Sequence, residues 1–250
     1  NDAVLCDHGN ESGDADLAIA TGSENASASM RSENFSGEIE SKVESLEEKP
    51  EIAFEKDFLR WMLSDGSGAV CLSDQPNAEG LSLEVQNIYI RSFAGTMETC
   101  MYAGCEKLED GSIKGWRGST PQELAENSVL SVKQDVKLLN ENVMEYTVFM
   151  ALEDMLKKGQ FKPEEIDWFL PHYSSSYFKD EVYQKMCKAN CDIPQSKWFT
   201  NLATKGNTGS ASIYIMLEEF LNKGIAKKGD KVLCYIPESG RFSTAFMLLE

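Results

Sequence analysis

The chain has 250 residues, of which 42% are hydrophobic, and a formal net charge of −17 at pH 7. This length and composition predict a globular protein, and the acidic balance argues against nucleic acid or an anionic membrane surface as a partner. No apolar run is long enough to cross a membrane, and "NDAVLCDHGNESGDADL" at the start lacks the basic and apolar segments of a signal peptide. We therefore expect a cytoplasmic protein.

The seven cysteines are odd in number, and their spacing matches neither a zinc ribbon nor a disulfide framework. With only two histidines in the chain, we expect no metal site and free thiols in a reducing compartment.

The first elements are short and separated by an acidic segment. "ADLAIATGSE" (residues 15–24) predicts a buried strand that ends in a turn, and "SDGSGAVCLSD" (64–74) predicts a glycine turn that leads into a second strand. Between them, residues 33–55 concentrate glutamate and predict an exposed excursion, followed by a helical stretch over 56–63.

The middle of the chain changes character twice. "LSLEVQNIYIRSF" alternates like a strand, and its apolar phase shifts between Val85 and Ile88, as at a β-bulge. From there to about Gln134 the glycine-rich, polar sequence predicts a loop, which could cover a pocket. Apolar positions at helical spacing then predict a helix over 142–158.

The last part alternates strands and helices. It predicts a short strand over 167–170 with His172 just past its end, and a helix over 176–189. A small-residue loop and a helix to Lys223 follow, and the chain closes with two strands around a turn at 238–240. This order indicates a layered α/β fold, in which ligands bind at strand ends.

The small-residue loop "LATKGNTGSAS" (202–212) has two interpretations. Its lack of side chains could let a ligand with partial negative charge approach the helix start. Alternatively, it could be a tight loop with Thr208 or Ser210 as the helix N-cap and dense packing at Gly209 and Ala211. His172 is likewise either structural or catalytic. Together with "GNTGSAS" and "PESGRFS" at the same expected edge, it could hold an oxyanion.

Several of these segments resemble one enzyme family. "DWFLPHYSSSYF" and "NLATKGNTGSASIYIMLEEFLNKGIAKKGDKVLCY" resemble the C-terminal half of β-ketoacyl-acyl-carrier-protein synthase III, in the thiolase superfamily, and "ADLAIATGSENAS" and "MLSDGSGAVCL" resemble its earlier strands. The resemblance implies a thiolase-like layered fold (α-β-α-β-α). It divides the chain into the remainder of an N-terminal half, 1–75, which includes the acidic excursion 33–55, and a complete C-terminal half, 76–250.

The resemblance also implies a site. It assigns the histidine and asparagine of a Cys-His-Asn triad to His172 and Asn207, and it suggests the backbone N–H of Ser239 as an oxyanion donor. Cys6 lies too close to the first strand to begin the long helix that carries the nucleophilic cysteine in the family. We therefore expect this chain to lack the N-terminal region with that cysteine. The motif His-Tyr-Ser-Ser, where the family usually has His-Gln-Ala-Asn, bears on the choice of substrate.

The implied function is a decarboxylative Claisen condensation of an acyl thioester with malonyl-acyl carrier protein, in fatty acid or polyketide synthesis, with acyl-CoA or acyl-carrier-protein substrates and no cofactor. Two alternatives remain: a non-catalytic thiolase-fold partner subunit, and an acyltransferase that forms esters or amides. Implied partners are acyl carrier protein and a second copy or companion chain. Lys179, Lys185 and Lys188 are the candidate docking surface for the carrier, and the alternative is that they form a solvated face.

Overall fold

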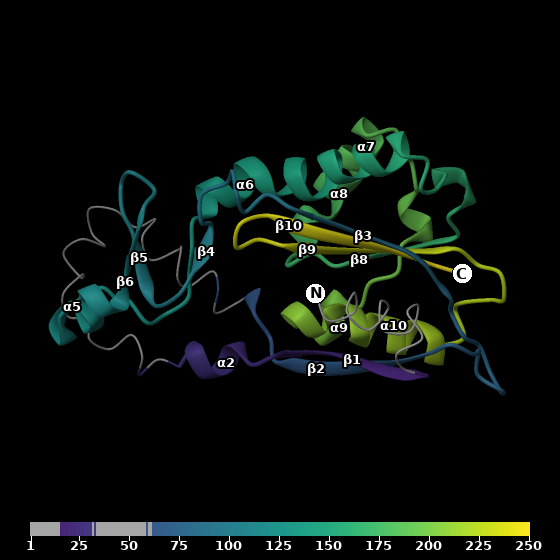
Figure 1. Cartoon of the computed structure of the whole chain (residues 1–250), viewed down its shortest axis with the longest axis horizontal. Helices are drawn as coiled ribbons and strands as arrows, with labels where there is room; N and C mark the ends of the chain where they lie inside the picture. The colour runs from purple at the N-terminus through teal and green to yellow at the C-terminus, as the bar shows by residue number, and fades with distance from the viewer. Residues whose placement is uncertain (1–15, 32, 34–58, 60–61) are drawn as a thin grey trace.

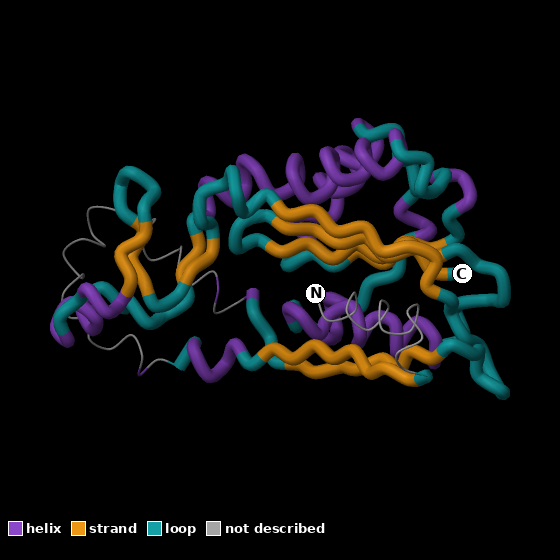
Figure 2. Tube along the Cα trace, in the orientation of Figure 1, coloured by secondary structure: helices purple, strands orange, loops and turns teal. Residues whose placement is uncertain are grey.

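Four layers of helices and strands alternate from the top to the bottom of Figure 1. The computed structural model describes residues 16–31, 33, 59 and 62–250. Helices α6 (Val136–Met144), α7 (Met150–Lys157) and α8 (Lys179–Lys188) cover the upper face of a four-stranded sheet. Helices α9 (Leu202–Lys205) and α10 (Ser212–Asn222) cover its lower face, and the two-stranded ribbon of β1 (Leu17–Glu24) and β2 (Gly66–Ser73) lies beneath α10 (Figures 1 and 2). The predicted layered α/β architecture is confirmed, and the described residues form four of the five expected layers.

The four-stranded sheet has the order β3-β10-β9-β8. Its strands are β3 (Val85–Ser92), β8 (Trp168–Pro171), β9 (Val232–Glu238) and β10 (Ser243–Leu249). β8 runs parallel to β9, and the other two pairs are antiparallel. Leu248 pairs with Asn87 but Leu249 pairs with Val85, so Gln86 is the extra residue of a bulge. The predicted strands and the predicted phase shift are confirmed.

The upper face of this sheet carries the larger core. It is covered by α6 (Val136–Met144), the π-helical segment η3 (Glu145–Phe149), α7 (Met150–Lys157) and α8 (Lys179–Lys188). The predicted start of the first helix at residue 142 was wrong, because the helix begins at Val136. Asp135 caps it: the Asp135 carboxylate accepts a hydrogen bond from the Leu138 N–H at 2.9 Å.

The lower face packs on α10 (Ser212–Asn222), which follows the short helix α9 (Leu202–Lys205). Met216, Leu217 and Phe220 of α10 form a buried cluster with strand residues that include Leu170, Val232 and Cys234. The alternate residues, such as Phe169, Leu233 and Tyr235, belong to the upper core. β8 and β9 are therefore buried on both faces, which explains their continuous apolar sequence.

The ribbon consists of β1 (Leu17–Glu24) and β2 (Gly66–Ser73), paired antiparallel from Leu17↔Ser73 to Glu24↔Gly66. Both predicted strands are confirmed, but the prediction that the first is buried was wrong: Leu17 and Ile19 are exposed, and β1 continues past Gly22 to Glu24. The short helix α2 (Ala26–Ser29) follows β1. A side chain on Gly22 or Gly68 would overlap Tyr214 of α10, so these glycines let the ribbon lie close to that helix.

The prediction of a loop up to Gln134 was wrong, because this region has structure of its own. It contains β4 (Met101–Tyr102) paired with β7 (Lys133–Gln134), β5 (Cys105–Lys107) paired with β6 (Ile113–Gly115), the 3-10 helix η2 (Trp116–Gly118) and α5 (Pro121–Glu126). Thr120 and Glu123 form a capping box at the start of α5, with Pro121 in the first turn. The residues of this capping box, Thr120, Pro121 and Glu123, can be read directly from the sequence.

Four further 3-10 helices connect the main elements: η4 (Pro163–Glu165), η5 (Ser176–Phe178), η6 (Gln195–Lys197) and η7 (Gly209–Ala211). The acidic excursion 33–55 and the helical stretch 56–63 lie almost entirely outside the described residues. The division at residue 75 stays a prediction. None of the described helices has the length and apolar character that crossing a membrane requires.

Candidate active site

The predicted site residue His172 lies at the carboxyl end of β8. The last residue of that strand, Pro171, is paired with Tyr235 of β9, and the His172 N–H donates to the Tyr235 carbonyl at 2.9 Å. Because β8 and its neighbour β9 are buried on both faces, the backbone at His172 is held by the sheet. The side chain that follows is therefore presented at a defined point of the sheet edge.

His172 is kept neutral by its surroundings. The residue is half-buried, and burial lowers the pKa of its imidazole from 6.5 to about 4. At neutral pH the ring therefore carries one N–H donor and no charge. A neutral imidazole of this kind can donate a hydrogen bond to a carbonyl oxygen that develops negative charge.

A small cavity brings His172 together with the small-residue loop. Its volume is about 10 Å³, and Gly206 and Ser212, on either side of Asn207, both contribute to its wall. The lining residues are Pro171, His172, Tyr173, Thr200, Asn201, Leu202, Gly206, Ser212 and Met216. Two segments that are distant in sequence, the end of β8 and the start of α10, therefore meet at one point.

Asn207 is buried, and local hydrogen bonds fix its orientation. Its Oδ1 accepts from the Gly209 N–H at 3.2 Å, and its backbone carbonyl accepts from the Ser64 N–H at 2.8 Å. Its Nδ2 amide group has no hydrogen-bond partner among the described residues. With the acceptor of the carboxamide engaged, the donor is the group left for a ligand.

The glycines of the loop are explained by what packs against them. Gly206 and Gly209 have φ values of +77° and +52°, which side chains rarely adopt. A Cβ on Gly206 would overlap Ser64, and a Cβ on Gly66 of β2 would lie 2.8 Å from Thr208. The loop is thus held against the ribbon, as the dense-packing interpretation predicts.

The predicted side-chain cap at the start of α10 was wrong. Neither Thr208 nor Ser210 caps the helix, because the first turn is the 3-10 helix η7. The Thr208 hydroxyl instead pairs with the Ser212 hydroxyl at 3.0 Å, and the Ser210 hydroxyl donates to the Ser23 carbonyl at 2.8 Å. Both hydroxyls tie the loop to its neighbours.

Ser239 lies in the turn between β9 and β10 and lines a different cavity from His172. This second cavity has a volume of about 70 Å³ and is lined by Gln134, Leu139, Val143, Met144, Ser174, Phe178, Pro237 and Ser239. The two cavities are close together in sequence: Ser174, which lines the second cavity, is two residues beyond His172, which lines the first. The role of the Ser239 backbone as an oxyanion donor stays a prediction.

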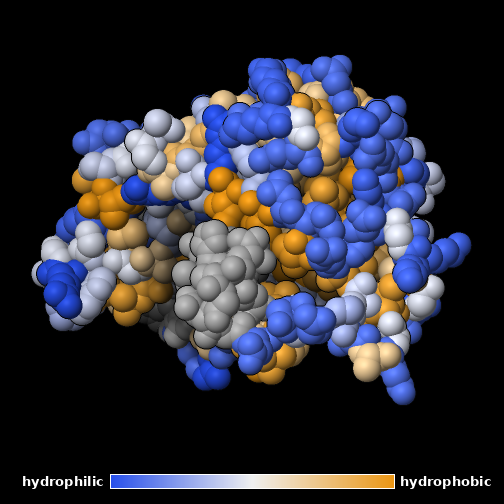
Figure 3. Space-filling model, turned by 45° about the vertical axis from the view of Figure 1, so that its right-hand side comes forward, coloured by the Kyte–Doolittle hydropathy of each residue, from blue (hydrophilic) through white to orange (hydrophobic). Residues whose placement is uncertain are grey.

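Two of the three predicted docking lysines are paired. Lys185 and Lys188 contact Glu145 of η3 at 2.5 and 3.1 Å, and the Lys188 ammonium lies 4.0 Å from the centre of the Phe149 ring. The pKa of Glu145 is lowered, chiefly by its hydrogen bond from Lys185. Hydrophilic residues dominate the upper part of the face in Figure 3, above apolar residues in its middle. Docking of a carrier on these lysines stays a prediction.

The cysteines in the described part of the chain do not line either cavity. None of Cys71, Cys100, Cys105, Cys187, Cys191 and Cys234 belongs to either lining. Burial raises the pKa of the Cys100 and Cys191 thiols to about 12. These buried thiols are therefore unsuited to act as thiolate nucleophiles.

Residues 156–240 match the family described as 3-oxoacyl-[acyl-carrier-protein] synthase III C terminal. The chain is 33% identical, over 148 residues, to β-ketoacyl-[acyl-carrier-protein] synthase III of Clostridium perfringens, a match that covers 55% of this chain and 43% of that protein. The chain thus spans about half the length of the curated relatives it matches.

Solved structures show the same fold. The 3-oxoacyl-[acyl-carrier-protein] synthase III from Aquifex aeolicus matches with a TM-score of 0.64 and 20% identity, over 100% of this chain and 62% of that chain. AbyA1, a tetronic acid condensing enzyme, matches with a TM-score of 0.68 and 16% identity, over 100% and 64%. The predicted thiolase-like α/β fold is confirmed.

Proposed function

We propose that this chain, which is similar to β-ketoacyl-[acyl-carrier-protein] synthase III, catalyses a decarboxylative Claisen condensation between an acyl thioester and malonyl-acyl carrier protein. The similarity in sequence over the His172 and Asn207 motifs supports this reaction class. The observation that carries the proposal is the meeting of a neutral His172 with the Asn207 loop at one point of the sheet edge.

In this proposal, His172 and Asn207 hold the malonyl thioester carbonyl. The bond to the malonyl carboxylate breaks, CO₂ leaves, and the electron pair moves into an enolate whose oxygen accepts hydrogen bonds from the His172 ring N–H and Asn207 Nδ2. Two donors at a developing oxyanion lower the barrier without a proton transfer. The enolate carbon then attacks the acyl-enzyme carbonyl, and the cysteine thiolate leaves.

The nucleophilic cysteine of this reaction is taken to lie outside the described residues. Among the cysteines that the structure describes, none lines either cavity, and burial raises the pKa of several. Acyl-CoA or acyl carrier protein as substrate, the absence of a cofactor, a homodimer or companion chain, and a cytoplasmic location are part of the proposal and rest on the resemblance.

The test uses His172→Ala and Asn207→Ala in the full-length protein. Each should lower malonyl decarboxylation about a hundredfold, the size expected for loss of an oxyanion donor, while cysteine acylation stays largely intact. Asn222→Ala is the matched control, because Asn222 is exposed on α10 and contacts Glu218. Unchanged decarboxylation in both site variants would contradict the proposal.

The same assay separates the alternative activities. An acyltransferase that forms esters or amides would consume the acyl thioester in the presence of an alcohol or amine without releasing CO₂. A non-catalytic partner subunit would show neither CO₂ release nor acylation, with or without the two substitutions.

A further inference from the structure

The larger cavity has an uneven lining. Five of its lining residues, Leu139, Val143, Met144, Phe178 and Pro237, are apolar, and three, Gln134, Ser174 and Ser239, are polar. An apolar pocket with a few placed polar groups is typical of a small-molecule site, in which the polar groups fix the orientation of the ligand.

Gln134 is the most deeply buried of the polar residues in this lining. Only 5% of its surface is exposed, and its Nε2 donates to the Ser239 hydroxyl at 3.3 Å. Its Oε1 has no hydrogen-bond partner among the described residues. This oxygen is not among the fully enclosed side-chain atoms that lack a partner, so it is open to a donor that enters the cavity.

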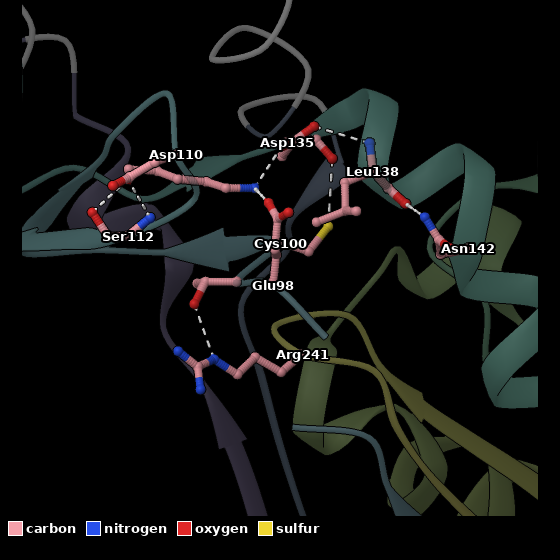
Figure 4. A network of polar contacts seen from close by, with 10 residues as sticks. Glu98, Cys100, Asp110, Ser112, Asp135, Leu138, Asn142 and Arg241 are labelled. Atoms are coloured by element: carbon pink, nitrogen blue, oxygen red, sulfur yellow. Dashed lines mark hydrogen bonds and ion pairs between the residues drawn. The ribbon is translucent and has the colours of Figure 1, made fainter. Parts of the chain in front are cut away.

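The backbone of Gln134 is held firmly. It is paired with Met101 across β4 and β7, and the next residue, Asp135, binds three neighbours. In Figure 4, dashed lines join Asp135 to Leu138 and to the sulfur of Cys100. The Asp135 N–H donates to the Cys100 carbonyl at 2.7 Å, and its carboxylate accepts from the Leu138 N–H and the Lys107 ammonium, both at 2.9 Å. Gln134 is therefore fixed at the start of the helix that forms the apolar wall.

We infer that Gln134 is a specificity-determining residue, which accepts a hydrogen bond from an N–H or O–H group of the bound thioester in the cavity it shares with Ser239. This inference rests on the proposed function. The donor has two possible sources, an amide N–H of the thioester arm or a hydroxyl on the acyl chain, and the shared chemistry is one donor group within an otherwise apolar ligand segment.

Binding of unreactive thioethers to the full-length protein tests the inference without turnover. One ligand pair, S-butyl-CoA and S-(3-hydroxybutyl)-CoA, differs by a chain hydroxyl. The other pair is the S-butyl thioether of N-acetylcysteamine and the analogue in which an ester replaces its amide, so the two differ by an amide N–H. Gln134→Leu removes the acceptor and puts an apolar side chain of similar size in its place. Gln160→Leu is the matched control, because Gln160 lies outside the cavity lining.

Gln134→Leu should weaken binding of the ligand with the decisive donor about three- to tenfold and leave its donor-free partner nearly unchanged, as loss of one hydrogen bond requires. A selective loss in the CoA pair identifies the acyl hydroxyl, and a selective loss in the N-acetylcysteamine pair identifies the arm amide. Equal effects on both members of both pairs, or effects no larger than those of Gln160→Leu, overturn the inference.

Failure of this inference and failure of the proposed function are distinguishable. If Gln134→Leu has no selective effect while His172→Ala abolishes decarboxylation, only the inference fails. If Gln134→Leu changes binding selectively while His172→Ala and Asn207→Ala leave decarboxylation unchanged, the cavity is a thioester site and the proposed reaction is wrong.

Discussion

Gly22 of β1 lies against the backbone carbonyl of Ser210, so closely that a methyl group on Gly22 would overlap the carbonyl oxygen. The same methyl group would lie 2.7 Å from the Tyr214 ring. The ribbon strand and the loop that carries Asn207 therefore share one close contact, and the contact depends on the absence of a side chain at residue 22.

Gly22→Ala should destabilise the protein by about 2 kcal/mol, because a backbone carbonyl cannot rotate away from the added methyl group. Urea unfolding measures the change. Gly115→Ala is the matched control: Gly115 also lies in a strand, but no other group lies within 4 Å of its added Cβ, so its loss of stability should stay below about 0.5 kcal/mol. Equal losses would show that the ribbon moves freely relative to the loop.

The lowered pKa of His172 predicts a pH dependence of stability. The folded protein holds this ring neutral down to about pH 4, whereas the unfolded chain protonates it below 6.5. Between these values the unfolded state binds more protons, so stability falls as the pH falls. Above pH 6.5 the ring is neutral in both states, so His172 causes no loss of stability. By pH 4, its protonation in the unfolded chain lowers the free energy of unfolding by up to about 3 kcal/mol.

Replacing the ring isolates this contribution from that of the carboxylates. His172→Gln removes the titrating group, so the variant should lose less stability than the wild type between pH 7 and pH 4.5 in urea unfolding. The carboxylates are common to both proteins and cancel in the difference. A difference that does not change with pH would mean that water reaches the ring and that its pKa is ordinary.

The parts of the fold predicted from the sequence are those in which a local pattern decides the structure. The apolar runs of β8 and β9 are continuous because both faces are buried, and the position of His172 follows from the end of β8. The bulge at Gln86 shows as a phase shift in the alternation. Each of these features is visible within about ten residues of sequence.

What was missed has two causes. The capping box of Thr120 and Glu123 and the cap at Asp135 are local signals that a polar, glycine-rich setting obscured. The contacts of Gln134 with Ser239 and of Gly22 with Ser210 join residues more than a hundred positions apart, so no window of sequence contains them. Their positions depend on how the layers stack.

Lys107 joins the region of β4 to β7 to the helical layer. Its ammonium lies 2.9 Å from Glu98 and 2.9 Å from Asp135, and its side chain is 11% exposed. Although burial by itself lowers the pKa of Lys107, the hydrogen bonds to Asp135 and Glu98 outweigh burial and raise it. A cation in this position compensates two carboxylates.

Lys107→Met should destabilise the protein by about 2 to 3 kcal/mol, because it leaves Asp135 and Glu98 close together without a cation. The double variant with Asp135→Asn should recover part of this loss, since the amide oxygen can still cap α6. Lys114→Met is the control, because Lys114 is more exposed and its ion pairs are 3.6 and 3.9 Å long. A loss no larger than that of the control would mean that the pair is screened by solvent.

The pairing of Lys185 and Lys188 with Glu145 changes how carrier docking has to be tested. Replacing these lysines by glutamate would place like charges beside Glu145 and disturb the contact between η3 and α8, whatever the role of the surface. Glutamine removes the positive charge without adding a negative one, and Glu145→Gln releases both lysines from their partner.

If this surface docks an acidic carrier, Lys185→Gln with Lys188→Gln should raise the KM for acyl-carrier-protein substrates several-fold, and Glu145→Gln should lower it about twofold, because the freed cations attract the carrier. The KM for the matching CoA thioester should change in neither variant. Lys157→Gln is the control, since Lys157 makes a comparable ion pair with Glu153 on α7. Equal changes for the carrier and CoA substrates, or none for either, would remove these lysines from the docking surface and favour the interpretation that they form a solvated face.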